Sequence, residues 1–356
     1  MSDGSAIFRF ENVTKRYGGV TALDDVSLAV SGNEYISLLG PSGSGKTTLL
    51  RVIAGFEVPD AGRVHFNGRD ITSLPAHERG IGFVFQNFAL FPHLSVFDNV
   101  AFGLANGVQA VPRAEIEERV HKVISLVGLA GMEGRGVHQI SGGQKQRVAL
   151  ARTLVMEPRL VLLDEPLGAL DANLRHRMRN ELRSIREALG VTFLHVTGSE
   201  SEALAMGDRV VVLDRGRVAQ FGRPDEVYAM PATPNVAHFL NRYNLFDGTC
   251  GNGEFTGPFG TLKTGKVTPS SRAVYAVRYD RMQVGAEAGG SGPSIAAAFV
   301  ASEYLGSSVM YFFETADGKV IEVEHHLSLG APQSFEPRQQ YVLRWKPEDA
   351  IVFGQG

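Results

Sequence analysis

Residues 40–48, GPSGSGKTT, combine glycines, hydroxyls and one lysine at a spacing that could hold a phosphate chain. The stretch matches G-x-x-x-x-G-K-[ST] and lies between an apolar run that predicts a strand (35–40) and a segment that predicts a helix (46–55). Glycines let the backbone fold into a nest of inward-pointing N–H groups beside the helix N-terminus, which favours an anion. Lys46 supplies positive charge for the β- and γ-phosphates, and Thr47 offers a hydroxyl to Mg²⁺. The residues that we expect to bind a nucleotide here are Gly40, Ser42, Gly43, Ser44, Gly45, Lys46, Thr47 and Thr48.

A second chemical group stands at the end of the apolar run VLLDEP (161–166). In a parallel sheet, ligands bind at the carboxyl ends of the strands, and Asp164 and Glu165 fall at such an end. Asp164 can hold the Mg²⁺ directly or through water, and Glu165 can polarise the attacking water. With Lys46 upstream, the pair predicts hydrolysis of a nucleoside triphosphate.

The elements that position these residues alternate between strand and helix up to about residue 220. Apolar runs at 81–86 and 191–197 predict strands, and apolar residues at i, i+4, i+7 and i+8 predict a helix over 113–128. This order predicts an α/β fold with a mostly parallel sheet. After Pro231 and Pro234 the pattern becomes all-β, so we place a domain boundary at about 235 and expect domains of residues 1–235 and 236–356.

Composition limits the class of protein. The net charge of −3 argues against a broad basic surface for nucleic acid, so we expect no nucleic-acid partner. Cys250 is the single cysteine, which rules out an internal disulfide and fits a reducing cytosol. We expect no signal peptide, because the N-terminal segment has no basic region followed by an apolar run. We expect no membrane span, because no apolar stretch approaches 18 residues. A membrane role would therefore come through a partner.

QISGGQKQRVALAR (139–152) distinguishes between kinds of phosphate-loop protein. Ser141 and Gln144 form an S-x-x-Q capping box, and Gly142 and Gly143 expose backbone N–H groups at the start of a helix. The chain thus has a second anion site. The segment resembles the LSGGQ signature of the ATP-binding cassette (ABC) family, with Ile140 where leucine is usual. The resemblance implies that Ser141, Gly142, Gly143 and Gln144 complete the ATP site of a second subunit.

The resemblance covers residues 7–230 and assigns further roles. It implies that Tyr17 stacks on adenine, and that Gln86 contacts Mg²⁺ and the attacking water. It places Asp171, as a further nucleotide-binding residue, in the loop after the catalytic glutamate, where Gly168 replaces a frequent serine. The catalytic residues implied are Glu165, Gln86 and Lys46, and the metal ligands are Thr47, Gln86 and Asp164.

Two further regions follow from the same resemblance. Residues 87–155 would be the helical subdomain of a P-loop NTPase cassette. Its apolar residues Phe88, Leu90, Phe91, Pro92 and Leu94 either form a groove for a helix of a membrane subunit or pack in the core. Residues 236–356 resemble the TOBE-type, OB-like β-barrel regulatory domain of ABC importers.

The function that the resemblance implies is that of the ATP-hydrolysing subunit of a bacterial ABC importer. The expected partners are a second ATPase subunit in a homodimer, two membrane-spanning permease subunits and a periplasmic or lipid-anchored solute-binding protein. The chain would lie at the cytoplasmic face of the inner membrane. At Asn244 and Phe246 the sequence resembles the ATPase subunits of importers of polyamines, ferric iron or related small solutes.

Gly198 departs from the family, which has a histidine that contacts the γ-phosphate at this position. His195 is a poor substitute, because an odd offset in a strand points to the opposite face unless the turn bulges. Ser199 or a water could reach the phosphate instead. We favour a working but slower ATPase. A soluble ABC-type ATPase and a hydrolysis-impaired regulatory module stay open as alternatives.

Overall fold

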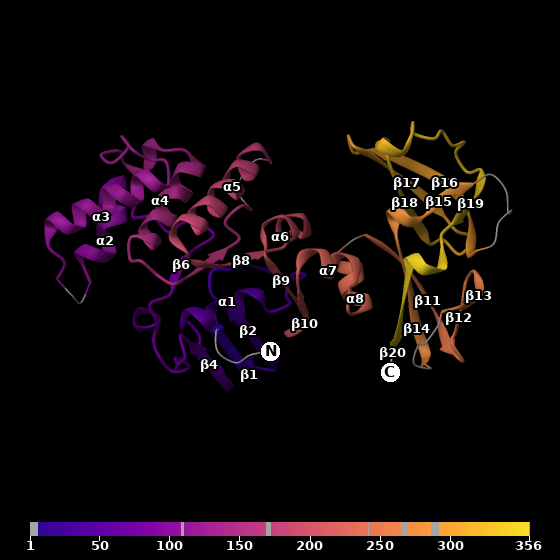
Figure 1. Cartoon of the computed structure of the whole chain (residues 1–356), viewed down its shortest axis with the longest axis horizontal. Coiled ribbons are helices and arrows are strands. Elements are labelled where there is room, and N and C mark those ends of the chain that lie inside the picture. The colour runs from indigo at the N-terminus through magenta and orange to yellow at the C-terminus, as the bar shows by residue number, and fades with distance from the viewer. Residues whose placement is uncertain are drawn as a thin grey trace. The chain divides into compact units, whose positions relative to one another are not determined.

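The computed structural model describes residues 6–107, 110–168, 172–240, 242–264, 270–285 and 292–355 (Figure 1). The chain divides into two compact units, Met1–Ala229 and Met230–Gly356. The division falls six residues before the boundary predicted at 235. Within the described ranges, every helix is too short or too polar to cross a membrane.

The first strands of the N-terminal unit form a separate antiparallel sheet of order β2-β1-β4-β5. β1 and β2 are joined through Gly18 and Gly19, and Gly18 has a left-handed φ of 57°. Phe8 and Phe10 face the core from β1. The bounds are β1 Ala6–Tyr17, β2 Val20–Ser31, β4 Ala61–Phe66 and β5 Arg69–Asp70, and a 3-10 helix, η1, spans Ala76–Glu78.

The second sheet positions the predicted chemistry. Its order is β10-β9-β3-β8-β7-β6, with all neighbours parallel except the β9–β10 hairpin. All five residues of β3 and all six of β8 are buried, as expected for central parallel strands. The predicted α/β class and mostly parallel sheet are confirmed. The strands are β3 Tyr35–Leu39, β6 Gly82–Val84, β7 Leu160–Asp164, β8 Thr192–Thr197, β9 Arg209–Asp214 and β10 Arg217–Gly222, and the helices of this part are α1 Lys46–Ala54, α5 Ala172–Leu189, α6 Glu200–Met206 and α7 Pro224–Ala229.

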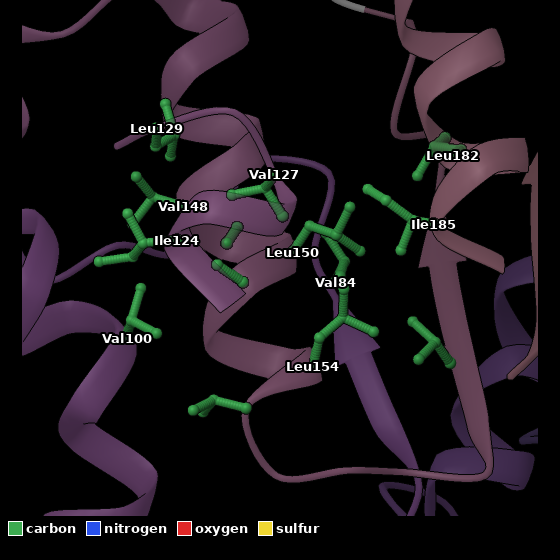
Figure 2. Packing of buried hydrophobic residues seen from close by; sticks show 14 of the residues in the cluster. Val84, Val100, Ile124, Val127, Leu129, Val148, Leu150, Leu154, Leu182 and Ile185 are labelled. Atoms are coloured by element: carbon green, nitrogen blue, oxygen red, sulfur yellow. The ribbon is translucent and has the colours of Figure 1, made fainter. Parts of the chain in front are cut away.

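A helical subdomain lies between β6 and β7. It contains α2 (Val96–Ala105), α3 (Arg113–Leu126), the short 3-10 helix η2 (Val137–Gln139) and α4 (Gly142–Leu154). Figure 2 shows Val100, Ile124 and Val148, one from each α-helix, in the same buried cluster. The helix predicted over 113–128 is confirmed. Phe88 and Leu90 pack against this core, whereas Pro92 is exposed.

Apart from the short helix α8 at its start and three 3-10 turns, the described part of the C-terminal unit is made of β-strands, as predicted. Its two five-stranded antiparallel sheets have the orders β13-β12-β11-β14-β20 and β15-β19-β16-β17-β18. The predicted turn at Asp317-Gly318 joins β17 to β18, and Gly318 has a φ of 82°. The elements are α8 Pro234–Phe239, β11 Tyr243–Gly251, β12 Glu254–Gly257, β13 Gly260–Lys263, β14 Ser270–Arg278, η3 Tyr279–Arg281, β15 Gln283–Gly285, β16 Ser294–Tyr304, β17 Ser308–Glu314, β18 Val320–His326, η4 Leu327–Leu329, β19 Gln340–Arg344, η5 Pro347–Asp349 and β20 Ala350–Gln355.

Asn244 and Phe246 have packing roles in this unit. The buried Asn244 side chain donates to the Glu322 carbonyl oxygen (2.7 Å) and accepts from the Glu322 N–H (3.0 Å), which joins β11 to the edge of the other sheet. Phe246 is fully buried and stacks on Trp345, with ring centroids 5.7 Å apart. These two residues therefore stabilise the domain in which they lie.

Candidate active site

The loop between β3 and α1 has the backbone that the glycines predict. Gly43 and Gly45 adopt left-handed φ values of 78° and 102°. A Cβ on Gly45 would lie 2.4 Å from the Ala22 carbonyl oxygen, and one on Gly40 would lie 2.3 Å from that of Leu213. Only glycine fits these two close approaches. Ser44 is buried in the loop, and its hydroxyl has no hydrogen-bond partner among the described residues.

Lys46, the first residue of α1, folds its side chain back over this loop. Its ammonium donates to the carbonyl oxygens of Gly40 (2.7 Å) and Pro41 (2.9 Å). Burial lowers the pKa of the Lys46 ammonium, and the nearby carboxylates of Glu165 and Asp164 oppose that shift. The loop, the lysine and the two acids thus belong to one electrostatic site.

Asp164 and Glu165 stand at the carboxyl end of β7. Burial raises the pKa of the Asp164 carboxyl, the Glu165 charge adds to the shift, and Arg51 and Lys46 oppose it. Two adjacent carboxylates in a half-buried position favour a bound cation, because it offsets both charges. Glu165 itself adopts a left-handed φ of 45°, and its N–H donates to the Val196 carbonyl oxygen (3.1 Å). Such backbone strain in a non-glycine residue is concentrated at functional sites.

Gln86 meets this acidic pair from a turn after β6. Its Nε2 donates to Glu165 Oε2 at 3.0 Å, which joins residues 79 positions apart in the sequence. β6 ends at Val84, earlier than the strand predicted to residue 86, because residues 86–89 form a turn. Gln86 therefore lies outside β6, and its exposed side chain points toward Glu165.

The segment after Ile140 forms the capping box that the sequence predicts. Ser141 is the N-cap of α4, and its N–H donates to Gln144 Oε1 (2.8 Å). The Gln144 N–H donates back to the Ser141 hydroxyl (3.4 Å). Ser141 and Gly142 are exposed, so the N-terminus of α4 is open at the surface of this chain.

The remaining predicted contacts lie around the loop or beyond the described residues. Tyr17 ends β1 with 42% of its surface exposed, and the Lys15 ammonium lies 5.3 Å from its ring centroid. Ser42 and Thr47 are exposed, and Thr48 is half-buried. Asp171 lies outside the described residues.

Gly198 follows β8 at the same edge of the sheet. No described heavy atom lies within 4 Å of the position that a Cβ would take, and the backbone is not left-handed. Ser199 is the N-cap of α6, where its hydroxyl accepts from the Glu202 N–H (3.3 Å) and lies 3.0 Å from the Ser201 hydroxyl. The Ser199 hydroxyl is therefore already used in capping.

His195 does not replace the missing side chain. The parallel register of β8 with β3 and β7 is continuous, so no bulge turns its imidazole toward the site. The ring is fully buried beside Tyr35, and its nitrogens have no partner among the described residues. Burial lowers the pKa of the His195 imidazole to about 3.

Sequence reasoning does not single out Arg152 or Asn99, which hold the backbone after Gln86. Arg152 donates to the carbonyl oxygens of Phe88 and Ala89, and Asn99 bonds to residues 91–95. Neither contact has a sequence signal, because each depends on where distant backbone carbonyls lie.

Comparison with known proteins adds two family matches. A family model described as ABC transporter matches residues 23–168, and one described as TOBE domain matches residues 275–353. The spermidine/putrescine import ATP-binding protein PotA of Rubrobacter xylanophilus is 42% identical over 97% of this chain and 93% of its own length. The Fe(3+) ions import ATP-binding protein FbpC of Agrobacterium fabrum is 42% identical over 91% of this chain and 92% of its own.

Solved structures of ATP-binding cassettes also resemble this chain. The dimeric structure of MJ0796, a bacterial ABC transporter cassette, is 33% identical and covers 61% of this chain and 98% of its own, with a TM-score of 0.55.

Proposed function

Since the chain belongs to the ABC transporter family and is the ATP-hydrolysing subunit of a bacterial importer, we propose that Lys46, Gln86, Asp164 and Glu165 form its hydrolytic site. The observation that carries this proposal is the 3.0 Å hydrogen bond between Gln86 and Glu165, beside the loop that holds Lys46. A glutamate fixed in this way can accept a proton from a water that attacks the γ-phosphate. Lys46 offsets the negative charge of the phosphates.

The residues present also fit a magnesium ion. The Thr47 hydroxyl, the Gln86 amide oxygen and the Asp164 carboxylate are hard oxygen donors, which Mg²⁺ prefers. The raised pKa of Asp164 reflects burial and the adjacent negative charge of Glu165, and a divalent cation would relieve both. When bound, the ion would neutralise charge on the phosphate oxygens.

We propose that the second half of the site comes from another copy of the chain. Ser141, Gly142, Gly143 and Gln144 lie at a capped helix N-terminus, of which Ser141 and Gly142 are exposed. Such a terminus can donate N–H groups to phosphate oxygens. Tyr17 would stack on the adenine. The dimeric relative MJ0796 supports this arrangement.

Importer ATP-binding subunits work with membrane permeases, and we propose that this chain does so at the cytoplasmic face of the inner membrane. The names of its relatives support a polyamine, ferric iron or a related small solute as cargo, delivered by a periplasmic or lipid-anchored binding protein. We assign ATP binding to residues 1–235 and a regulatory role to residues 236–356.

The test is Mg-ATP binding and turnover by the purified chain. Glu165→Gln should keep binding, stop turnover and accumulate a closed dimer, since it removes only the base. Lys46→Ala should abolish tight binding, since it removes a charge from the phosphate loop. Turnover by Glu165→Gln at the parent rate would exclude Glu165 as the base.

The relatives are importer ATP-binding subunits and do not favour the two alternatives, a soluble ABC-type ATPase and a hydrolysis-impaired module. Gly198 nevertheless departs from the family, and a parent chain without turnover, alone and with its permease, would contradict the proposed hydrolytic site.

A further inference from the structure

The turn that carries Gln86 has an unfavourable backbone. Phe88 and Ala89 are consecutive non-glycine residues with left-handed φ values of 63° and 45°. The turn is closed by hydrogen bonds from the Phe88 N–H to the Phe85 carbonyl oxygen (2.9 Å) and from the Ala89 N–H to that of Asn87 (2.7 Å). Residues with a Cβ keep such a conformation only where surrounding groups hold it.

A single guanidinium supplies that hold. Arg152 Nη2 donates to the Phe88 carbonyl oxygen at 2.9 Å, and Nη1 donates to that of Ala89 at 2.7 Å. The same group lies 5.5 Å from the ring centroid of Phe91. A planar fork can reach two neighbouring carbonyls and stack on a ring at once, whereas the point charge of a lysine cannot.

The next residues of the segment are held by the buried Asn99 of α2. Its amide donates to the carbonyl oxygens of Phe91 (3.1 Å), Leu94 (3.3 Å) and Ser95 (3.0 Å), and its oxygen accepts from the Phe91 N–H (2.9 Å). Residues 88–95 are thus attached to the helical subdomain. Gln86, two residues before them, is attached through Glu165 to the parallel sheet.

One helix connects this clamp to the signature segment. Arg152 lies in the last turn of α4, and Ser141 caps the first, so the two are about 16 Å apart along a continuous helix. We propose that Arg152 is a positioning residue that couples the orientation of α4 to the position of Gln86, and through Gln86 to Glu165. When the N-terminus of α4 contacts a nucleotide, the helix moves as a unit and carries the two bonded carbonyls with it. This inference rests on the proposed roles of Gln86 and Glu165.

The first test needs no turnover. Hydrogen exchange is measured on the purified full chain with and without Mg²⁺ and a non-hydrolysable ATP analogue. In the parent, the analogue should slow exchange in both the phosphate loop (40–48) and residues 85–95. Arg152→Gln should lose the response at 85–95 and keep it at 40–48, and Arg152→Lys should lose most of it. The control is Arg159→Gln, an exposed arginine just before β7, which should behave like the parent. A parent-like response at 85–95 in Arg152→Gln would overturn the inference.

The second test separates positioning from stability. Arg152→Gln should lower kcat by about 10–100-fold with KM within about twofold, since it displaces a group without removing it. In a Gln86→Ala background the same change should lower kcat by less than about twofold, because the coupling ends at Gln86. Equal losses in both backgrounds, with a matching fall in Tm, would show a purely structural role. Failure of the hydrolytic assignment would appear separately, as turnover by Glu165→Gln, and leaves the exchange result unaffected.

Discussion

Gly198→His should restore a contact that this chain lacks. The site can take the side chain without strain, because no described heavy atom lies within 4 Å of the Cβ position and φ is not positive. Gly198 directly follows β8, whose Val196 carbonyl accepts from the Glu165 N–H, so the new imidazole would lie at the same edge of the sheet as Glu165. One charge-assisted contact to the γ-phosphate in the transition state is worth about 2.7–4 kcal/mol, which corresponds to about 10²–10³ in rate.

The measurement is Mg-ATP turnover by the chain and by its complex with the permease. We expect the parent to turn over slowly and Gly198→His to raise kcat by up to about 10²–10³-fold, with the full gain if nothing compensates. Gly198→Ala is the matched control, since it adds a Cβ and no imidazole, and it should stay at the parent rate.

Three outcomes would change this reasoning. A Gly198→His chain no faster than Gly198→Ala would refute the idea that the missing histidine limits the rate. If the parent had no turnover and Gly198→His restored it, the idea that Ser199 or a water replaces the missing histidine would be refuted. A parent as fast as Gly198→His and slowed sharply by Ser199→Ala would assign the contact to Ser199, provided that Tm shows little loss from the removed helix cap.

Two predictions concern stability. A chain that ends at residue 235 should still unfold cooperatively and bind Mg-ATP, because the first unit has its own core; a broad transition in calorimetry would contradict this. His195 should make the protein acid-sensitive, because the unfolded chain protonates it below its ordinary pKa of 6.5 and the folded chain only near 3. The contribution of neutral His195 to the free energy of unfolding is therefore complete above pH 6.5 and decreases as pH falls. At pH 5 the loss is about 2 kcal/mol. His195→Leu should remove this loss in urea titrations at pH 7 and pH 5, and an unchanged pH dependence would refute the assignment.

Local patterns account for the parts of the fold that the sequence predicts. The strand, glycine loop and helix around residues 40–48 are contiguous, and so are the capping box at Ser141 and the turn at Gly318. Local patterns do not predict which sheet a strand joins, because that depends on pairing with strands far away in the sequence. β1 pairs with β4, some 50 residues away, and this separates the first strands from the parallel sheet that carries the site.

The site divides in the same way. The phosphate loop and the acids at the end of β7 follow from residue types and from the edge at which parallel strands end. The family resemblance implies only that Gln86 contacts Mg²⁺ and the attacking water. Its hydrogen bond to Glu165, 79 positions away, is seen in the structure alone. The clamp of Arg152 on residues 88 and 89 could not be predicted, because it depends on left-handed backbone that only the packed structure reveals.

Glu165 is where the two unusual features of the chain meet. Its backbone N–H is bonded to β8, the strand that ends just before Gly198, and its carboxylate is bonded to Gln86, whose turn Arg152 holds. The family resemblance implies a histidine at position 198 that would help to hold the same glutamate and its water. Without that side chain, the orientation of the Glu165 carboxylate depends more on Gln86, and hence on the helical subdomain to which the turn is attached. We therefore infer that hydrolysis in this chain depends more on the position of α4 than it would with a histidine at position 198.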